Sequence, residues 1–145
     1  MKYKVRAVQP NDFYKDHINL LNQLTSCPDM SYSEYHHQLI NITTQNGHIY
    51  VVEHNNKIIA SATLLIEYKL IHNNGKVGHI EDVVVNNEFR NNGLGKQLIT
   101  HCLQEAKQMN CYKVILDCNQ DNVDFYIKCG LTQKEIQMVK YFTPN

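Results

Sequence analysis

The chain has 145 residues, with 14 lysines and arginines against 14 aspartates and glutamates, so its formal net charge at pH 7 is zero. A balanced charge excludes a general attraction to nucleic acid or to an anionic membrane surface, so any anion site must be local. A chain of this length fits a single domain, residues 1–145, that buries about two-thirds of its surface.

The sequence carries no signal for membrane insertion or for secretion. No apolar run approaches the roughly 20 residues that a membrane-spanning helix needs. The N-terminal residues MKYKVRAVQP lack the apolar core of a signal peptide. Five cysteines without a C-x-x-C pair favour reduced thiols over disulfides or a zinc site. These features predict a soluble, cytoplasmic protein without a bound metal.

The first half predicts a strand, two helices and a β-hairpin. Polar and apolar residues alternate in the strand segments, and both helices have capping residues before an apolar stripe. The adjacent His36 and His37 lie on the second helix and point apart, which argues against a metal site. The expected bounds are 3–7 for the strand, 11 or 12 to 25 for the first helix, 31 or 33 to about 44 for the second, and 49–53 with 57–68 for the hairpin.

The segment from Gly78 to Met109 organises the rest of the chain. It reads as a Val-rich strand from Ile80 to Val85, a loop with the sequence RNNGLG, and an amphipathic helix. Backbone N–H groups at such a helix start lack intrahelical acceptors and lie at the positive end of the helix dipole, which suits a phosphate or pyrophosphate. The loop is not the dinucleotide fingerprint G-x-G-x-x-G. The stripe expected to be buried is Leu94, Leu98, Ile99, Cys102, Leu103 and Ala106.

The last third completes an α/β (α+β) pattern. Residues 113–118 (KVILDC) are almost all apolar, which is typical of a strand buried on both faces. A short helix from Asn122 to Cys129 is closed by Gly130, and a final strand is expected around 137–142. Alternating helices and strands predict a mixed central sheet flanked by helices.

Three carboxylates and a phenol are the candidates for chemistry. Glu81 and Asp82 are adjacent, so on a regular strand one of them is buried unless the strand is bulged or splayed there. Asp117 follows an apolar strand, at the end where open α/β sheets bind ligands. Tyr126 lies in the short helix, where core packing is the ordinary role of a tyrosine.

The segments GHIEDVVV, RNNGLGK, CYKVILDC and NVDFYIKCGL resemble the glucosamine 6-phosphate N-acetyltransferases, a family within the GCN5-related N-acetyltransferases. The R-x-x-G-x-G piece occurs throughout the larger group, whereas the other segments are narrower. The similarity extends from about Arg6 to Phe142. It implies a mixed sheet with a splayed central strand. It also implies transfer of acetyl from acetyl-CoA to the 2-amino group of glucosamine 6-phosphate, for UDP-N-acetylglucosamine synthesis.

The same resemblance assigns roles to individual residues. The backbone of Val83, Val84 and Val85 would pair with the pantetheine arm like an added strand. Asn122 and Tyr126 match positions beside the pantetheine and the thioester sulfur. The amides expected to hold the pyrophosphate are those of Arg90, Asn91, Asn92, Gly93, Leu94, Gly95 and Lys96. The residues expected to contact the sugar are Lys69, Leu70, Ile71, His72, Glu81, Asp82 and Asp117, and those expected to contact its phosphate are Thr25 and Lys113.

The chemistry of acetyl transfer agrees with these roles. An ammonium group cannot attack a thioester, so a carboxylate must accept its proton, and the sequence does not rank Glu81 against Asp117. Backbone N–H groups near Val83 would stabilise the charge that develops on the carbonyl oxygen. Tyr126 would donate a hydrogen bond or proton to the departing thiolate. Direct transfer without an acyl-enzyme is expected.

One position departs from the family pattern. Family members carry an arginine three residues after the position of Met138, where it binds the sugar phosphate, and here that position is Tyr141. A tyrosine cannot reproduce the planar fork of arginine. Lys140, in a shifted register, or Lys113 alone would have to supply the charge. The resemblance also implies a homodimer in which the C-terminal strand contributes to the partner.

Two other functions fit much of the same pattern. An acetyltransferase of the same fold could act on another amine, such as a protein N-terminus or a polyamine. A catalytically silent acyl-CoA-binding module would use the same loop without turnover. The presence of Glu81, Asp117 and Tyr126 argues against the silent module.

Overall fold

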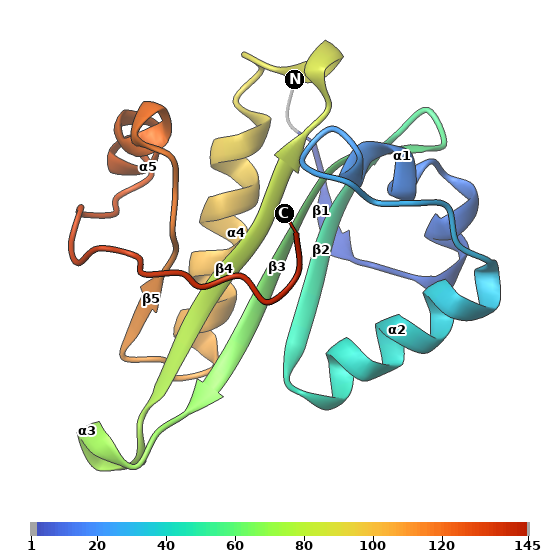
Figure 1. Ribbon diagram of the computed structural model, residues 1–145. Coiled ribbons are helices and arrows are strands. Elements are labelled where there is room, and N and C mark those ends of the chain that lie inside the picture. Colours follow the sequence, from blue (N-terminus) through green and yellow to red (C-terminus); the bar gives the residue numbers. More distant parts are fainter. Residues whose placement is uncertain (1–2, 145) are drawn as a thin grey trace.

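The computed structural model describes residues 3–144 and contains a five-stranded sheet with the order β1-β2-β3-β4-β5 (Figure 1). Neighbouring strands are antiparallel except for β4 and β5, which are parallel. The expected mixed sheet is therefore confirmed. The strands are β1 (Val5–Ala7), β2 (Gly47–His54), β3 (Lys57–Tyr68), β4 (Lys76–Val85) and β5 (Lys113–Ile115).

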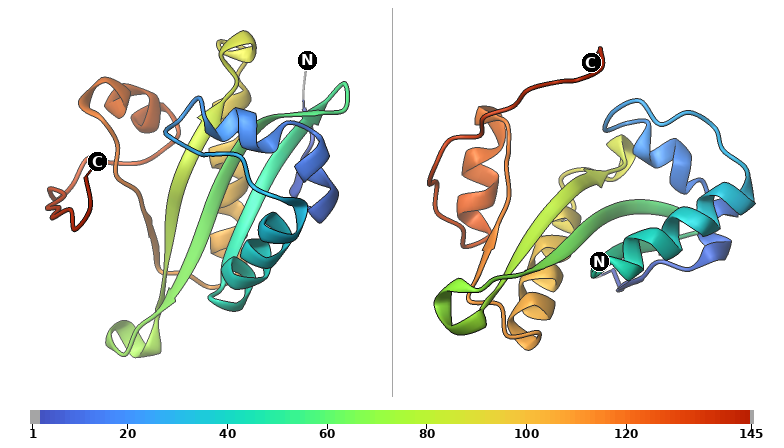
Figure 2. Two further views of the ribbon diagram at one scale, coloured as in Figure 1. Left: turned by 45° about the vertical axis from the view of Figure 1, so that its right-hand side comes forward. Right: turned by 60° about the horizontal axis from the view of Figure 1, so that its bottom comes forward.

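Helices cover both faces of this sheet. The long helix α4 lies against one face, and α1 and α2 lie on the other (Figures 1 and 2). Among residues 3–144, no helix has the length and apolar character needed to cross a bilayer. The α-helices are α1 (His17–Leu21), α2 (Tyr32–Thr44), α3 (Ile71–Asn74), α4 (Leu94–Gln108) and α5 (Val123–Lys128). The short 3-10 helices are η1 (Pro10–Tyr14), η2 (Asn87–Phe89) and η3 (Gln120–Asn122).

The apolar stripe of α4 forms the larger core, as the sequence predicts. Leu98, Ile99 and Cys102 are fully buried against the even-numbered residues of β3 from Ala60 to Ile66. Each buried Leu or Ile side chain contributes about 1.5–3 kcal/mol of stability. This packing fixes the start of α4 relative to β4, and so fixes the glycine loop between them.

Local sequence features determine where α2 begins and how β2 turns into β3. Ser31 Oγ accepts a hydrogen bond from the Glu34 amide at 3.1 Å, and Glu34 Oε1 accepts one from the Ser31 amide at 3.1 Å. This capping box starts α2 at the earlier of the two expected positions. Asn55 and Asn56 both have positive φ, 49° and 63°. That conformation matches the twist of a two-residue hairpin turn.

The single first helix that the sequence predicts is instead two short segments, η1 and α1. Asp12 does not act as the expected cap residue of a long helix. Its fully buried carboxylate accepts hydrogen bonds from Arg6 of β1 at 2.8 and 2.9 Å. Asp16 then takes a left-handed conformation with a φ of 60°, which ends η1 before α1 begins. The tie to β1 therefore overrides the helical pattern.

The predictions for the last two strands are wrong. The strand expected over 113–118 and buried on both faces is limited to Lys113–Ile115, where Lys113 and Ile115 are exposed. Residues 137–142, expected to form the final strand, have no strand pairing. The chain therefore leaves β5 as an edge strand with one partner, and the tail lies apart from the sheet (Figure 2). The large apolar side chains of the tail stay exposed, Met138 at 89% and Phe142 at 90%.

Candidate active site

A β-bulge in β4 resolves the conflict between the two adjacent carboxylates. Thr63 pairs with Glu81 and Ser61 pairs with Val84, so two residues of β4 lie opposite the single Ala62. Asp82 occupies the bulge with a φ of 52°. Such bulges bend a strand and redirect side chains, often beside active sites. As a result neither Glu81 nor Asp82 is buried, which confirms the bulged alternative.

Strands β4 and β5 separate toward the carboxyl end of β4. They pair only along Val77–His79, whereas β4 continues to Val85 (Figure 1). Within residues 3–144, no strand pairs with the β5-side edge of β4 after His79. This splay leaves an open backbone edge along Val83–Val85, the stretch that the sequence assigns to a pantetheine arm. An extended group can hydrogen-bond to such an edge.

The glycine loop presents free backbone amides at the start of α4. In the part of the chain that the structure describes, the amides from Arg90 to Lys96 have no hydrogen-bond acceptor. Gly93 is the N-cap residue with a φ of 74°, and a Cβ placed on it would meet no atom within 4 Å. A Cβ on Gly95 would lie 3.1 Å from the Phe125 ring, so this glycine allows α5 to pack closely. The free amides and the helix dipole together fit a pyrophosphate.

Glu81 lies on β4, and Asp117 lies two residues after the end of β5. Partial burial raises the pKa of Glu81, and the negative charges of Asp82 and Asp117 raise it further, whereas His79 lowers it. Glu81 is two residues beyond His79, and Asp117 is two residues beyond Ile115, the strand partner of His79, so the two residues lie on opposite sides of the start of the splay. A carboxylate with a raised pKa is a stronger base than an ordinary one.

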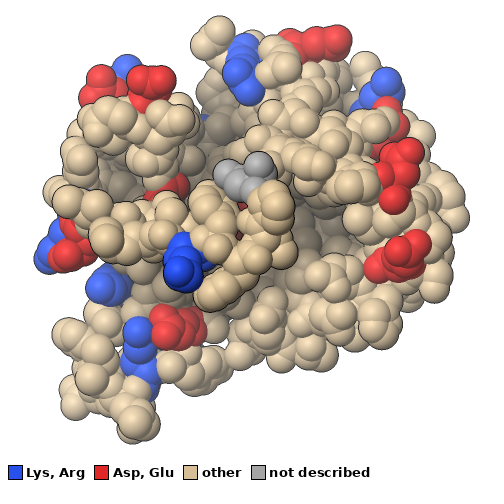
Figure 3. Space-filling view, in the orientation of Figure 1, with Lys and Arg blue, Asp and Glu red and all other residues tan. Residues whose placement is uncertain are grey.

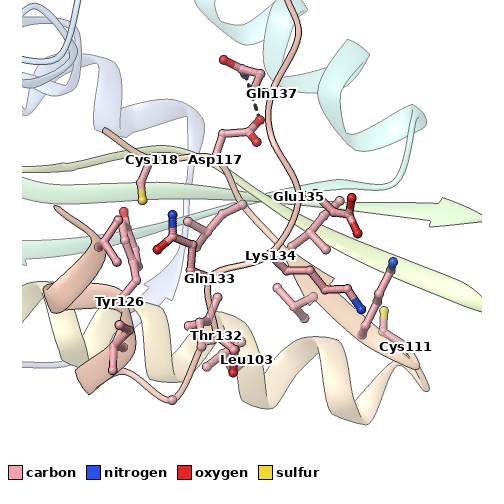
Figure 4. Close-up of a pocket in the computed structure, with 18 of the residues that line it drawn as sticks. Leu103, Cys111, Asp117, Cys118, Tyr126, Thr132, Gln133, Lys134, Glu135 and Gln137 are labelled. Carbon is pink, nitrogen blue, oxygen red and sulfur yellow. Dashed lines mark hydrogen bonds between the residues drawn. The ribbon is translucent and has the colours of Figure 1, made fainter. Parts of the chain in front are cut away.

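Tyr126 and Asp117 line the same cavity of about 730 Å³, between β5, α5 and residues 130–137 (Figure 4). Burial, followed by the nearby thiols of Cys118 and Cys129, raises the pKa of Tyr126 to about 12. Its phenol is therefore protonated at neutral pH and acts as a hydrogen-bond donor. The glycine loop and Glu81 do not line this cavity; they lie along the β4 side of the splay.

Sequence reasoning missed two contacts to the candidate residues. Gln137 Nε2 donates a hydrogen bond to Asp117 Oδ2 at 2.9 Å, so the tail holds one of the candidate bases (Figure 4). Glu67 of β3 holds His79 of β4 through His79 Nε2 at 2.9 Å. Its other carboxylate oxygen lies 3.1 Å from Lys69 Nζ. His79 is two residues before Glu81, a spacing that puts both on one face of a strand and could have pointed to it.

The residues expected to contact the sugar phosphate are not together in one chain. Gln23 accepts a hydrogen bond from the Asn87 amide, which places nearby Thr25 beyond the carboxyl end of β4. Lys113 pairs with Val77 near the other end of that strand. At about 3.3 Å per residue these ends are roughly 26 Å apart. One phosphate cannot reach both side chains of the same chain.

The tip of the β3–β4 hairpin, which holds Leu70 to His72, projects away from the glycine loop (Figure 1). His72, Asn73 and Asn74 all have left-handed φ values between 54° and 57°. Each such non-glycine residue costs about 1–2 kcal/mol. The His72 ring stacks on Tyr112 at 4.2 Å and helps to hold this conformation. Leu70 remains 91% exposed, so the tip lies outside the cleft of its own chain.

Figure 3 shows side chains of both signs scattered over one face rather than gathered in a patch. Within residues 3–144, no three or more His, Cys, Asp and Glu side chains are grouped as metal ligands are. Asn122 is exposed at the start of α5, on the same short helix as Tyr126.

A splayed parallel pair beside a glycine loop with free amides defines an acyl-CoA-dependent acyltransferase site. In agreement, residues 16–131 match the Acetyltransferase (GNAT) family, and the chain belongs to that family. It is 42% identical to glucosamine 6-phosphate N-acetyltransferase of Arabidopsis thaliana over 144 residues, 97% of each chain. It is 38% identical to the Dictyostelium discoideum glucosamine 6-phosphate N-acetyltransferase 1 over 94% of this chain and 88% of that protein. The crystal structure of the Arabidopsis enzyme superimposes with a TM-score of 0.94, at 41% identity, over 99% of this chain and 100% of the other.

Proposed function

We propose that this chain transfers the acetyl group of acetyl-CoA to the 2-amino group of glucosamine 6-phosphate. The product, N-acetylglucosamine 6-phosphate, would serve UDP-N-acetylglucosamine synthesis. The observation that carries the proposal is the arrangement around the β4 splay. Free loop amides lie at its carboxyl end, Glu81 and Asp82 lie at the bulge of β4, and Asp117 follows the end of β5 across the splay. The names of the relatives, matched over almost the whole chain, support this substrate.

Acetyl-CoA supplies a thioester whose acetyl group is open to attack by a neutral amine. The amides from Arg90 to Lys96 bind its pyrophosphate, and the open edge of Val83–Val85 pairs with the pantetheine. Asn122 lies beside that arm. The backbone near Val83, at the bulge, stabilises the charge that develops on the carbonyl oxygen. Binding of acetyl-CoA therefore depends more on backbone groups than on side chains.

Glu81 accepts the proton of the substrate ammonium, directly or through water. Its raised pKa favours this role. Glu81 lies next to the bulge on β4, the strand whose open edge would pair with the pantetheine. Asp82 and Asp117 bind the hydroxyl groups of the sugar and keep Glu81 basic through their charge. Gln137 holds Asp117 in place. Tyr126 donates a hydrogen bond to the departing thiolate, because its phenol is protonated at neutral pH.

A homodimer completes the amine site. Thr25 and Lys113 cannot meet in one chain, and the tail exposes Ile136, Met138 and Phe142. A partner that pairs with the tail would bury these side chains. It would also bring its hairpin tip, with Lys69 to His72, and its Lys113 to the other cleft. Because Tyr141 stands where family members have arginine, Lys113 supplies the positive charge for the phosphate.

The test is release of free thiol from acetyl-CoA with a panel of amines at one concentration. Glucosamine 6-phosphate should be the best substrate, ahead of glucosamine, polyamines and peptide N-termini. A preferred different amine would replace the substrate but keep the enzyme class. Binding of acetyl-CoA without turnover of any amine would instead establish the silent module. As a control, Glu81→Gln combined with Asp117→Asn should abolish turnover at pH 7 and partly spare it at high pH, where the amine is already neutral.

A further inference from the structure

A hydrogen-bonded chain of three side chains leads from the neighbourhood of Glu81 to solvent. Glu67 bridges His79 Nε2, at 2.9 Å, and Lys69 Nζ, at 3.1 Å, with one carboxylate oxygen for each. Their side chains are between 25% and 43% exposed, so the chain runs from a half-buried imidazole to the surface. Neither His79 nor Glu67 has a part in the proposed acetyl transfer.

The Glu67 carboxylate fixes the tautomer of His79. An ionised carboxylate only accepts hydrogen bonds, so the proton of a neutral imidazole must lie on Nε2. The bonds to His79 and then to Lys69 lower the pKa of Glu67, which keeps it ionised. Nδ1 then carries the free lone pair, and no group between residues 3 and 144 is hydrogen-bonded to it. The ring is therefore ready to accept a proton on the side away from Glu67.

His79 and Glu81 lie on the same face of β4. The register between them is unbroken, since Leu65 pairs with His79 and Thr63 with Glu81, and the bulge begins only at Asp82. Alternate residues of a strand are about 7 Å apart and point to one side, a gap that one water molecule between their side chains spans. When His79 carries the proton, its positive charge favours the ionised form of Glu81.

We propose that His79, held by Glu67, relays to solvent the proton that Glu81 takes from the substrate amine. His79 is a positioning residue that acts through Glu81, and its role rests on the proposed function. The substrate ammonium loses one proton to the Glu81 carboxylate. Glu81 passes it to Nδ1 of His79, and the imidazolium, whose Nε2–H stays bonded to Glu67, releases the Nδ1 proton to water. Each side chain then returns to its starting protonation state.

Other charged groups surround this relay. Asp82 and Asp117 act on Glu81 from β4 and from the segment after β5. Lys69 faces the relay through Glu67, and Lys113 lies across the β4–β5 ladder, opposite Val77. The negative carboxylates favour protonation near Glu81, whereas the positive lysines disfavour protonation at the Glu67 end of the relay. The pH profile of the enzyme therefore reflects all of these charged side chains together.

His79→Ala is the deciding variant, and His101→Ala is its matched control. The two histidines are equally exposed, 25% and 26%, and each lies near a glutamate through Nε2, since His101 is 3.6 Å from Glu105 on α4. At pH 7 His79→Ala should lower kcat at least about tenfold, with little change in the KM for glucosamine 6-phosphate. Added imidazole should restore turnover to His79→Ala. His101→Ala should keep wild-type turnover and show no response to imidazole.

Glu67→Gln provides the second readout, because it keeps the side-chain shape but removes the charge and frees the tautomer. It should lower kcat and alter the pH profile in the same sense as His79→Ala. The relay is overturned if wild-type protein is active but His79→Ala matches His101→Ala, or if its loss does not respond to imidazole. If wild-type protein itself releases no thiol with glucosamine 6-phosphate, the proposed function fails instead.

Discussion

The two sides of the β4 splay differ in how far one chain completes them. On the β4 side, the bulge, the glycine loop and α4 are packed by their own chain, and the loop amides are free for a ligand. On the β5 side, the strand has three residues, and the large apolar side chains of the tail between Ile136 and Phe142 are exposed. Under the proposed function, cofactor recognition would therefore be local to one chain, whereas the amine site would need a second surface.

A charged substitution in the tail should reduce activity more than any other single substitution proposed for this protein. Met138→Asp should leave the fold of the chain intact, because this side chain is 89% exposed. We expect it to prevent dimer formation and to lower acetyl transfer about 100-fold, since the partner residues no longer reach the substrate. Acetyl-CoA affinity should stay within about twofold, by analogy with other remote substitutions. Light scattering, calorimetric binding and thiol release measure the three quantities.

Ile40→Asp is the control for that experiment, because Ile40 is an exposed apolar residue of α2 outside the tail. It should leave both mass and turnover unchanged. A Met138→Asp protein that is monomeric but fully active would show that one chain forms the whole site. Dimer formation would then not be needed for the amine site.

The sequence predicts the β4 side of the splay well, because its signals are local. The glycine at position 93 allows a positive φ, and the spacing of Leu94, Leu98 and Ile99 predicts one helix face. The adjacent acidic pair at Glu81 leaves a bulge as one of the alternatives, and the structure has it. The β5 side was predicted wrongly from equally apolar residues. Apolar composition shows that a segment needs to be covered, but it does not show which surface covers it.

A second prediction concerns a buried histidine on the face of the sheet that α1 and α2 cover. His17 is buried between Tyr35 Oη, at 2.6 Å from Nδ1, and Ser61 Oγ, at 3.0 Å from Nε2. Burial lowers its pKa to about 4. The unfolded chain therefore binds a proton between pH 6.5 and 4 that the folded chain does not, and stability falls as the pH falls through this window.

Between pH 7 and pH 5 the free energy of unfolding should decrease by about 2 kcal/mol from this one group. Urea unfolding at the two pH values measures the decrease. His17→Gln keeps polar contacts to Tyr35 and Ser61 but cannot titrate, so its stability should depend less on pH. An equal pH dependence in the variant would assign the effect to other groups.

A more modest change is expected when the negative charge beside Glu81 is removed. Asp82→Asn removes a negative charge that raises the pKa of Glu81, so that pKa should fall. The base then stays ionised at lower pH, and the acid limb of the kcat/KM profile should move to lower pH. Asp16→Asn is the matched control, since both aspartates are exposed with left-handed φ values of 52° and 60°. A limb that stays in place would exclude Glu81 as the titrating base.

The contacts between side chains that are distant in sequence were not predictable. Glu67 meets His79 through strand pairing, Gln137 meets Asp117 through the path of the tail, and His17 meets Ser61 because α1 packs on β3. A single sequence gives the period of each strand but not its register against the next. Only the three-dimensional arrangement shows these partners.

The most direct measurement records the backbone amide signals from Arg90 to Lys96 by ¹⁵N NMR while CoA is added to the protein. These amides have no acceptor within residues 3–144, so they should shift together as the pyrophosphate accepts their hydrogen bonds. Amides late in α4, such as that of Lys107, should not move. If CoA binds and the loop signals stay in place, the glycine loop is not the cofactor site and the account of this protein is wrong.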